Sequence, residues 1–419
     1  MTSLTSTGST SPTLQHSGIL HRLAKPLLLK MIAGLRYGSI TIKEDDQIQT
    51  YGTDSSLHAM IIINDPAAYA RILIGGSIGA GESYIDGLWE ADNLTSLVRI
   101  IVLNMELLDD IEAKMAWFLR PLRRIQHLFK DNTKKGSKEN ILAHYDLGNE
   151  LYKSFLDPSM MYSSAIYPES SSSLEEASKY KLDYICQKLQ LNGQDKVIEI
   201  GSGWGGFAIY AATHFGCHVT TTTISEAQYQ EAQKRIEEAG LSKQITLLKQ
   251  DYRDLEGHYD KLVSIEMIEA VGYKYLPVFF EKCGSLMRSG GMMLLQAITI
   301  QDQKFSRYIK DVDFIQKHIF PGGCLTSNSH MLSLIAEKTD MVVRSIEDFG
   351  FDYAKTLKEW RHRFLASFSK IESQGYDQRF KRLWEFYLSY CEGGFQERSI
   401  SVVQLVATKP HNRFPVIHP

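Results

Sequence analysis

The sequence has few cysteines, and none of them is arranged to hold a metal ion or a disulfide framework. The chain of 419 residues has five, with no C-x-x-C pair and no histidine cluster at zinc spacing. We therefore expect reduced thiols, a cytoplasmic protein and no metal site. The cysteines are Cys186, Cys217, Cys283, Cys324 and Cys391.

Strong net charge and long apolar runs are also absent. A net charge of −3 argues against a nucleic-acid-binding protein. No apolar run reaches the roughly 20 residues needed to cross a bilayer, so any contact with a membrane is expected to be peripheral. Residues 1–18 are rich in serine and threonine and lack the basic-then-apolar order of a secretion signal, which predicts a disordered tail.

The length and the ordinary apolar content of 43% predict a globular protein of two domains. Residues 19–128 combine a helical pattern with short alternating strands, which predicts a small α+β domain; the family resemblance given below implies that this domain engages lipid. Within it, four glycines in residues 75–81 predict tight turns or a close approach of the backbone to a ligand. Residues 129–140 are expected to form a basic linker, and residues 141–410 the catalytic domain.

Two basic segments are candidates for membrane contact. Residues 19–36 place apolar side chains on one helical face with basic residues among them, as in a basic amphipathic helix. The alternative is a helix that packs on its own domain, begun or kinked by Pro26. A second basic run predicts either a solvated linker or an edge that binds lipid phosphates. Its members are Arg120, Arg123, Arg124, Lys130, Lys134, Lys135 and Lys138.

The stretch DKVIEIGSGWGGFAIYAA, residues 195–212, organises the catalytic domain. Its β-branched run predicts a buried strand, and Gly201, Gly203 and Gly206 follow as G-x-G-x-x-G. Glycines after a strand let backbone N–H groups and a helix N-terminus approach a polar ligand closely. A dinucleotide enzyme would carry the same glycines, so the flanking residues must decide.

The flanking residues favour S-adenosylmethionine. Glu199 precedes the first glycine, where a carboxylate attracts a cationic amino-acid head group and repels a pyrophosphate. Thr223 stands where a dinucleotide fold usually places the acid that binds a ribose, although Glu226 lies nearby. A doubly wound sheet without this specific ligand is the alternative.

Downstream of the glycines, strand and helix patterns alternate up to residue 300, which predicts right-handed βαβ units and a mostly parallel, seven-stranded, Rossmann-like sheet of the class I methyltransferase type. Residues 301–340 and 350–395 are expected to be aromatic-rich insertions. One of the last two strands follows each insertion. Ligands of such folds bind at the carboxyl ends of the strands. The polar residues expected there are Glu199, Thr223 to Gln228, Asp251, Tyr252, Glu266, Glu269 and Gln296.

These residues carry a resemblance to a known family. The chain resembles the cyclopropane-fatty-acyl-phospholipid synthases and the related mycolic acid methyltransferases over about residues 70–408. The resemblance rests on HYDLGNELYKSFLDPSMMYSSAIY, EIGSGWGGFA, TISEAQ, QDYRDL, SIEMIEAVG, IFPGGCL and FYLSYCEGGF, in this order, with GESYIDGLWE in the amino-terminal domain.

The resemblance implies that a methyl group passes from S-adenosylmethionine to a cis double bond of an acyl chain, and that loss of a proton from the added methyl closes a cyclopropane ring. It also implies a membrane phospholipid substrate, peripheral membrane contact and a homodimer. The residues expected to bind the donor are Tyr162, Ser163, Glu199, Gly201, Gly203, Gly205, Thr223, Ser225, Gln228, Asp251 and Tyr252.

The family also holds a bicarbonate ion that takes the proton, and the resemblance places the catalytic residues around it. Ser164 stands for the family's cysteine and Gln296 for its histidine, and an amide cannot become charged or carry a proton. Glu266 falls where the relatives usually have glycine. We therefore expect that bicarbonate matters less here, and that Glu269, positioned by Tyr387 and Gln296, supplies the charge or takes the proton. The catalytic candidates are Glu269, Tyr387, Gln296, Ser164, Ile298 and Glu266.

The sequence thus predicts a methyltransferase that gives cyclopropane fatty acids at the inner face of the membrane. An altered base pocket could instead lead to a methyl-branched or methylated unsaturated product. A small-molecule amine N-methyltransferase and a catalytically silent lipid-binding protein are further alternatives, which the amino-terminal domain and the intact donor motif respectively disfavour.

Overall fold

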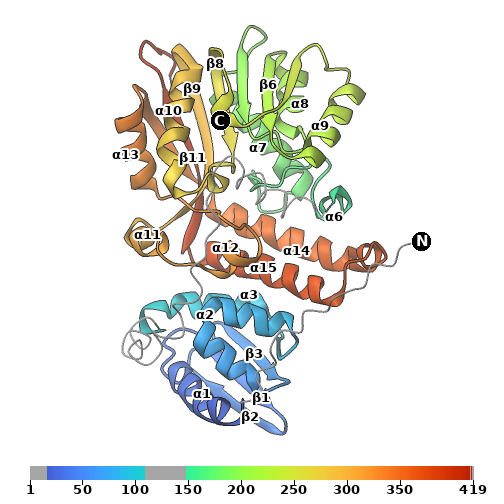
Figure 1. Ribbon diagram of the computed structural model, residues 1–419, viewed down its shortest axis with the longest axis vertical. Helices are drawn as coiled ribbons and strands as arrows, with labels where there is room; N and C mark the ends of the chain where they lie inside the picture. Colours follow the sequence, from blue (N-terminus) through green and yellow to red (C-terminus); the bar gives the residue numbers. More distant parts are fainter. Residues whose placement is uncertain (1–16, 109–147, 416, 418–419) are drawn as a thin grey trace, which may run out of the picture. The chain divides into compact units, whose positions relative to one another are not determined.

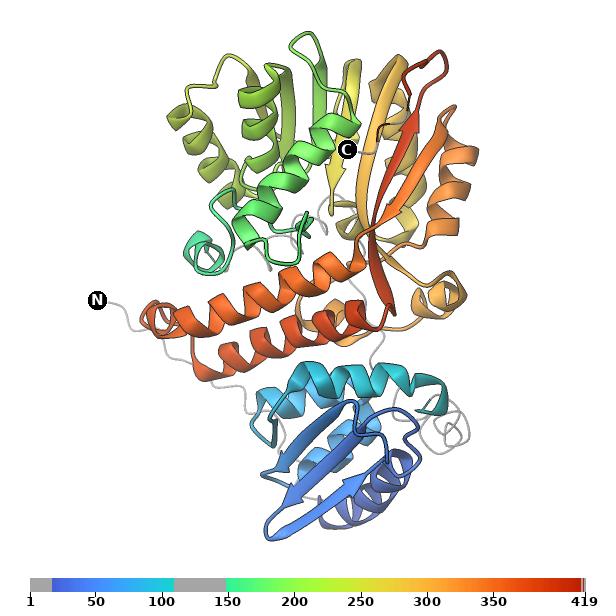
Figure 2. The same ribbon diagram turned by 180° about the vertical axis from the view of Figure 1, so that it is seen from behind.

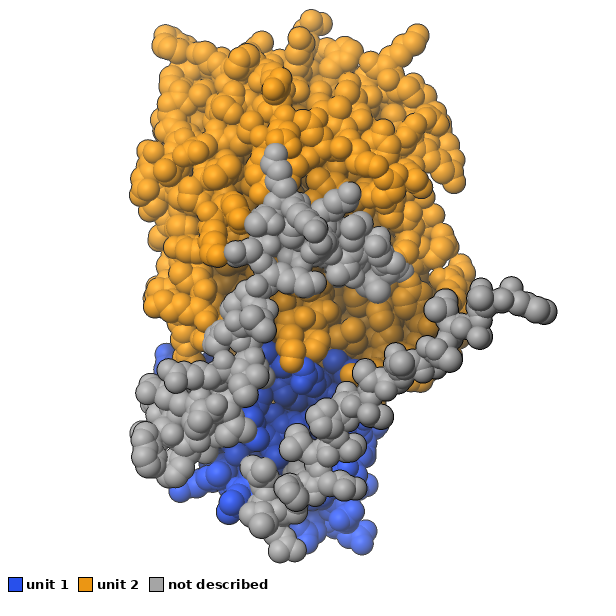
Figure 3. All heavy atoms as spheres, viewed as in Figure 1, with its two compact units in different colours: residues 1–93, 104–125 blue, residues 94–103, 126–419 orange. Residues whose placement is uncertain are grey.

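The computed structural model describes residues 17–108, 148–415 and 417, and it divides the chain into two compact units. Figure 3 shows unit 1 as residues 1–93 and 104–125 and unit 2 as residues 94–103 and 126–419. The expected linker at 129–140, the basic run from Arg120 to Lys138 and most of the expected tail lie outside the described residues.

Among the described residues, unit 1 contains a four-stranded sheet and the helices α1 and α2, and the alternating patterns of residues 39–63 predicted the first three of its strands. The sheet has the order β2-β1-β3-β4, with β1 antiparallel to β2 and parallel to β3. Helix α1 continues through Pro26. The elements are α1 (Ser17–Ile32), β1 (Ser39–Glu44), β2 (Gln47–Tyr51), β3 (His58–Ile63), α2 (Ala67–Ile85) and β4 (Trp89–Ala91).

The glycine-dense segment of unit 1 forms a helix, and the prediction of tight turns there was wrong. Helix α2 runs through all four glycines and is interrupted at Gly76, whose φ of 54° and ψ of −132° are not helical. At Gly79 a Cβ atom would lie 2.0 Å from the carbonyl oxygen of Arg71, so only glycine allows the chain to pass this close. The glycines therefore permit a sharp kink inside one helix.

Helix α3 (Leu94–Leu103) belongs to unit 2, although the expected amino-terminal domain extended to residue 128. Within unit 2 it packs against α15 (Gln378–Gln396). Gly393 of α15 leaves room for this, since a Cβ there would come within 2.7 Å of Val98. The apolar spacing of residues 94–105 predicted the helix but not the partner it packs on.

The seven-stranded sheet of unit 2 confirms the predicted class I fold. Its order is β10-β11-β9-β8-β5-β6-β7, and β11 runs antiparallel to the other six strands. The strands are β5 (Lys196–Ile200), β6 (His218–Thr223), β7 (Ile245–Lys249), β8 (Tyr259–Ile265), β9 (Met287–Ile300), β10 (Val342–Asp348) and β11 (Ile400–Thr408).

Helices cover both faces of this sheet, and a separate apolar core fills each side (Figures 1 and 2). One core joins the sheet to α10 and α13, and the other joins it to α7, α8 and α9. β5 is buried along nearly its whole length, as its continuous apolar run predicted. These helices are α7 (Leu174–Lys188), α8 (Gly206–Phe215), α9 (Glu226–Glu238), α10 (Leu276–Leu286) and α13 (Asn328–Lys338).

The two expected aromatic insertions are helical. The second forms α14 (Gly350–Glu372) and α15, which pack against each other, and α14 also contacts β11. In α14 the buried residues recur at helical spacing from Tyr353 through Leu357, Trp360 and Phe364. The first insertion and the segment before α7 add only short helices besides α13: α6 (Asn149–Lys153), α11 (Asp302–Tyr308) and α12 (Phe314–His318).

Candidate active site

A cavity opens at the carboxyl ends of β5, β6 and β8, where the fold predicted the ligand. Most of the expected donor-binding residues line it, together with Glu266. Gly205 and Ser225 do not: Gly205 begins α8 in the left-handed conformation, and Ser225 caps α9 by accepting a bond from the backbone of Gln228. The lining residues from the expected donor set are Tyr162, Ser163, Glu199, Gly201, Gly203, Thr223, Gln228, Asp251 and Tyr252.

Two glycines of the loop have different surroundings: Gly201 packs closely against a protein side chain, and Gly203 faces open space. Gly201 has a φ of 99°, and a Cβ on it would come within 2.9 Å of Met267. Gly203 has a φ of 49°, and a Cβ on it would meet nothing within 4 Å. Because Gly203 lines the cavity, a side chain there would enter the space that a ligand would use.

Glu199 is a buried acid at the end of β5 whose surroundings suit a cation. Only 2% of it is exposed, and its Oε2 accepts a hydrogen bond from the Thr221 hydroxyl at 2.5 Å. Burial raises the pKa of Glu199 to about 8, because the charged form is poorly solvated there. An ammonium group bound beside it would stabilise the carboxylate, so the site fits the cationic head group of S-adenosylmethionine.

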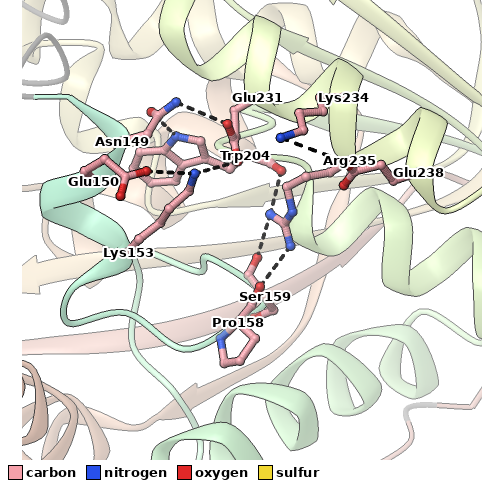
Figure 4. A network of polar contacts seen from close by, with 10 residues as sticks. All are labelled: Asn149, Glu150, Lys153, Pro158, Ser159, Trp204, Glu231, Lys234, Arg235 and Glu238. Atoms are coloured by element: carbon pink, nitrogen blue, oxygen red, sulfur yellow. Dashed lines mark hydrogen bonds and ion pairs between the residues drawn. The ribbon is translucent and has the colours of Figure 1, made fainter.

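Arg235 of α9 ties the glycine loop to the segment before α7 (Figure 4). Its guanidinium donates to the carbonyl oxygen of Trp204 at 2.7 Å and to those of Ser159 and Pro158 at 3.1 Å each. The Trp204 indole in turn donates to Asn149 at 2.8 Å. No role was predicted for Arg235; it lies next to Ile236, one of the buried residues of α9.

Glu266 lies at the end of β8 and accepts hydrogen bonds on both carboxylate oxygens. The backbone N–H of Ser164 and the amide of Gln296 donate to Oε1 at 2.9 and 2.8 Å, and the Tyr353 hydroxyl donates to Oε2 at 2.7 Å. Tyr353 lies 87 residues away on α14 and was not predicted as a partner of this acid. The helical spacing of its apolar neighbours predicted only that this face of α14 is buried.

Lys181 of α7 is a buried cation near this carboxylate. Its side chain is 0% exposed, and its ammonium donates to the Ser163 hydroxyl at 2.6 Å. Burial lowers the pKa of Lys181 to about 8, while the negative charges of Glu266 and Asp157 oppose that shift. In return the Lys181 ammonium favours the ionised form of Glu266, against the burial that raises the pKa of this acid.

Glu269 lies one turn further along, in the short 3-10 helix Ile268–Ala270. Its Oε1 accepts a hydrogen bond from the backbone N–H of Ile298 at 2.5 Å, whereas its buried Oε2 has no partner among the described residues. Burial, with the negative charge of Glu266, raises the pKa of Glu269 to about 8.

Among the described residues, neither Gln296 nor Tyr387 makes a hydrogen bond to Glu269, so the expected positioning of this acid by them was wrong. The amide of Gln296 bonds to Glu266, and the Tyr387 hydroxyl lies 2.9 Å from that of Tyr162. Ser164 contacts Glu266 through its backbone, while its hydroxyl bonds to the Ala165 carbonyl oxygen. The spacing along the chain located these residues in one region but could not assign the pairs.

Comparisons with known proteins agree with this geometry. A sequence model of the family described as mycolic acid cyclopropane synthetase matches residues 132–405. The cyclopropane-fatty-acyl-phospholipid synthase of Escherichia coli K12 is 38% identical over 85% of this chain and 89% of its own. The tuberculostearic acid methyltransferase UfaA1 of Mycobacterium tuberculosis is 33% identical over 86% of this chain and 85% of its own.

Among solved structures, the mycolic acid cyclopropane synthase CmaA1 in complex with SAH and CTAB superposes with a TM-score of 0.61. It is 27% identical, and the match covers 65% of this chain and 98% of that chain. The fold and the donor cavity thus define a class I S-adenosylmethionine-dependent methyltransferase. The chain belongs to the mycolic acid cyclopropane synthetase family.

Proposed function

We propose that this enzyme transfers a methyl group to the cis double bond of unsaturated acyl chains in membrane phospholipids and closes a cyclopropane ring. The observation that carries the proposal is the wall of the donor cavity, which combines a carboxylate, Glu266, with an aromatic side chain, Tyr162. The name of the relative from Escherichia coli, at 38% identity, supports the same substrate class.

The charge that develops on the substrate explains why such a wall suits the reaction. S-adenosylmethionine supplies an electrophilic methyl group, and methylation of a neutral alkene places positive charge on an acyl carbon. A nearby anion in a water-poor site stabilises that charge strongly. Aromatic faces add cation–π attraction, and the ring of Tyr162 lies 5.2 Å from those of Trp360 and Tyr152.

The apolar surroundings of Tyr162 support an acyl chain as the substrate. Phe155, Trp360 and Trp384 form a buried cluster of aromatic rings next to Tyr162, with ring centroids 6.0 to 6.3 Å from that of Phe155. Transfer of an aliphatic chain from water to apolar surroundings is favourable, whereas a charged amine substrate would lose its hydration there.

A methylated unsaturated or methyl-branched product is the second candidate. It is favoured by the altered base pocket, in which Glu266 and Gln296 contact each other, and by the name of the relative UfaA1. A ring and a methylated alkene differ in which proton leaves the methylated cation and where its electron pair goes, whereas a saturated methyl branch requires a hydride from a separate reductant.

Deuterium labelling tests the proposal and separates the two products. Purified enzyme is incubated with vesicles of a cis-monounsaturated phospholipid and a donor carrying a CD3 group, and the acyl chains are analysed by mass spectrometry. A ring retains two of the donor's deuterons, because one leaves from the added methyl, whereas an alkene formed by loss of a proton from the chain retains all three. An exocyclic methylene also retains two, and ozonolysis, which cleaves the alkene and leaves the ring intact, separates it from the ring. Saturated phospholipid vesicles are the control, and absence of label from the unsaturated chains would overturn the proposal.

Contact with the membrane is proposed to be peripheral and to come from the amino-terminal part of the chain, on the inner face of a cytoplasmic membrane. Within the described ranges, no helix is both long enough and apolar enough to span a bilayer. Helix α1 exposes Leu23 by 62% and Leu27 by 38%, one turn apart, while Ala24 and Ile32 are buried. Part of this helix therefore packs on unit 1 and part of its apolar surface stays accessible to lipid.

A further inference from the structure

The carboxylate of Glu266 is held as a bound anion would be. It accepts from a backbone N–H, an amide and a tyrosine hydroxyl, all at 2.7 to 2.9 Å, with the Lys181 ammonium as the nearby positive charge. Its backbone has a φ of 49°, in the left-handed region that residues other than glycine seldom adopt. Such strain persists when surrounding contacts demand it, as it does at functional sites.

A bicarbonate ion does not fit beside this carboxylate. Ser164 and Gln296 are two of the positions that the family resemblance assigns to the ion, and both already donate to Oε1 of Glu266. These hydrogen-bond donors are therefore not available to a second anion, which would also lie next to a negative charge. Both effects disfavour its binding.

We infer that the carboxylate of Glu266 fills the anion position itself and acts as the general base of the reaction. This inference rests on the proposed function. After the methyl group has joined one carbon of the double bond, Oε1 or Oε2 of Glu266 takes a proton from that methyl. The electron pair of the broken C–H bond forms the C–C bond that closes the ring, and the protonated acid then returns the proton to solvent.

Glu266 suits this role better than Glu269 does. Glu266 lines the donor cavity, whereas Glu269 is not among the lining residues and its free oxygen is buried. Glu266 has donors on both oxygens, and Glu269 has one backbone donor. When two neighbouring acids differ in this way, the acid with fewer hydrogen-bond donors holds the proton and the other acid stays ionised. Glu269 is therefore the neutral partner of the pair.

A series of hydrogen-bonded, buried side chains fixes the orientation of the Gln296 amide, which is a hydrogen-bond donor to Glu266. The Lys188 ammonium donates to Oε1 of Gln404 at 3.2 Å, and the amide of Gln404 donates to Oε1 of Gln296 at 3.0 Å. With its oxygen occupied, Gln296 must turn its NH2 group toward Glu266. Lys188, Gln404 and Gln296 therefore act as positioning residues that keep a donor directed at the base.

Two substitutions at one position test the inference. Glu266→Gln keeps the shape of the side chain but removes the base, so turnover should fall roughly 10²- to 10⁴-fold and added bicarbonate should not restore it. Glu266→Gly removes the side chain and suits the φ of 49°, so it should fold, lose turnover and regain part of it when bicarbonate or formate is added. The exposed Glu256→Gln is the matched control and should behave like the wild type.

Anion binding, followed by the melting temperature, provides a readout that needs no substrate. Bicarbonate should raise the melting temperature of Glu266→Gly and leave that of the wild type unchanged. Affinity for S-adenosylmethionine, measured by calorimetry, should stay within about threefold in all variants. The inference is overturned if wild-type turnover collapses when bicarbonate is depleted, if Glu266→Gln retains turnover, or if Glu266→Gly binds no small anion. A wild type that labels no acyl chain would instead overturn the proposed function.

Discussion

Gln296 and Glu266 contact each other twice across the neighbouring strands β9 and β8. The backbone N–H of Glu266 donates to the carbonyl oxygen of Gln296 at 2.8 Å, and the amide of Gln296 donates to the carboxylate of Glu266, also at 2.8 Å. The parallel pairing of Ile265 with Gln296 produces this register. The sheet itself thus places the amide beside Glu266 and leaves Glu269 to the backbone of Ile298.

Replacing Gly203 by leucine should abolish donor binding, because the side chain would enter the cavity. The expected loss of affinity for S-adenosylmethionine is at least about 100-fold, or roughly 3 kcal/mol. Gly240→Leu is the matched control, since Gly240 also has a positive φ and open space around a Cβ but lies in an exposed turn after α9. Both variants should lose similar stability to backbone strain, so equal donor affinities by calorimetry would contradict the assignment of the cavity.

Arg235→Met should loosen the glycine loop. The substitution removes the hydrogen bonds from the guanidinium to the carbonyl oxygens of Trp204, Ser159 and Pro158, which we expect to cost about 1–3 kcal/mol in the free energy of unfolding. Donor affinity should fall about tenfold, because the loop is no longer held in place. The neighbouring Lys234→Met is the control: Lys234 is 64% exposed and pairs with Glu238 on the surface, so both quantities should stay near wild type.

Lys181→Met should shift the acid limb of the pH–rate profile upward. The Lys181 ammonium favours the ionised form of Glu266, so its loss raises the pKa of that carboxylate. Because the base must be ionised to accept a proton, turnover at low pH falls first and the midpoint moves to higher pH. The exposed Lys179→Met should leave the midpoint in place. A Lys181→Met profile that is only scaled down, with its midpoint unmoved, would assign Lys181 a purely structural role.

Glu269→Gln should weaken the pH dependence of stability. The folded pKa of Glu269 is about 8, above the ordinary value of 4.5, so the folded state holds an extra proton between these values and stability falls as pH rises through them. The amide carries no such proton. Urea unfolding between pH 5 and pH 8 should therefore show a smaller loss of stability for the variant, by up to about 1.4 kcal/mol per pH unit. Parallel curves for the two proteins would mean that Glu269 is already ionised.

The basic run beyond the described residues should contribute to membrane binding. Neutralising Arg120, Arg123, Arg124 and Lys130 should reduce sedimentation with anionic liposomes, most clearly at low salt, because salt screens these contacts. Leu23→Ser with Leu27→Ser should reduce it at high salt as well, since burial of apolar surface is not screened. If neither set of substitutions changes sedimentation, the amino-terminal part of the chain does not provide the contact.

Much of the fold could be predicted from local patterns, because strands and helices depend on neighbouring residues. The β-branched run 197–200 is buried as β5, the glycines after it begin α8, and the pattern alternation predicted the seven-stranded sheet. The position of polar residues at strand ends also placed Glu199 and Glu266 at the cavity, since parallel strands bring their carboxyl ends together. The prediction of tight turns at residues 75–81 was wrong because these glycines permit a kink within α2. Packing against neighbouring residues decides between a turn and a kinked helix.

The partners of Glu266 and Glu269 could not be predicted, because they depend on how distant elements meet. Tyr353 reaches Glu266 from α14, and Lys181 reaches the same region from α7. No spacing along the chain relates these residues, and only the docking of both helices around the sheet makes them neighbours. The sequence alone therefore determined the fold class and the motif that binds S-adenosylmethionine. The tertiary structure decided which of two adjacent acids, Glu266 or Glu269, receives enough hydrogen bonds to stay charged.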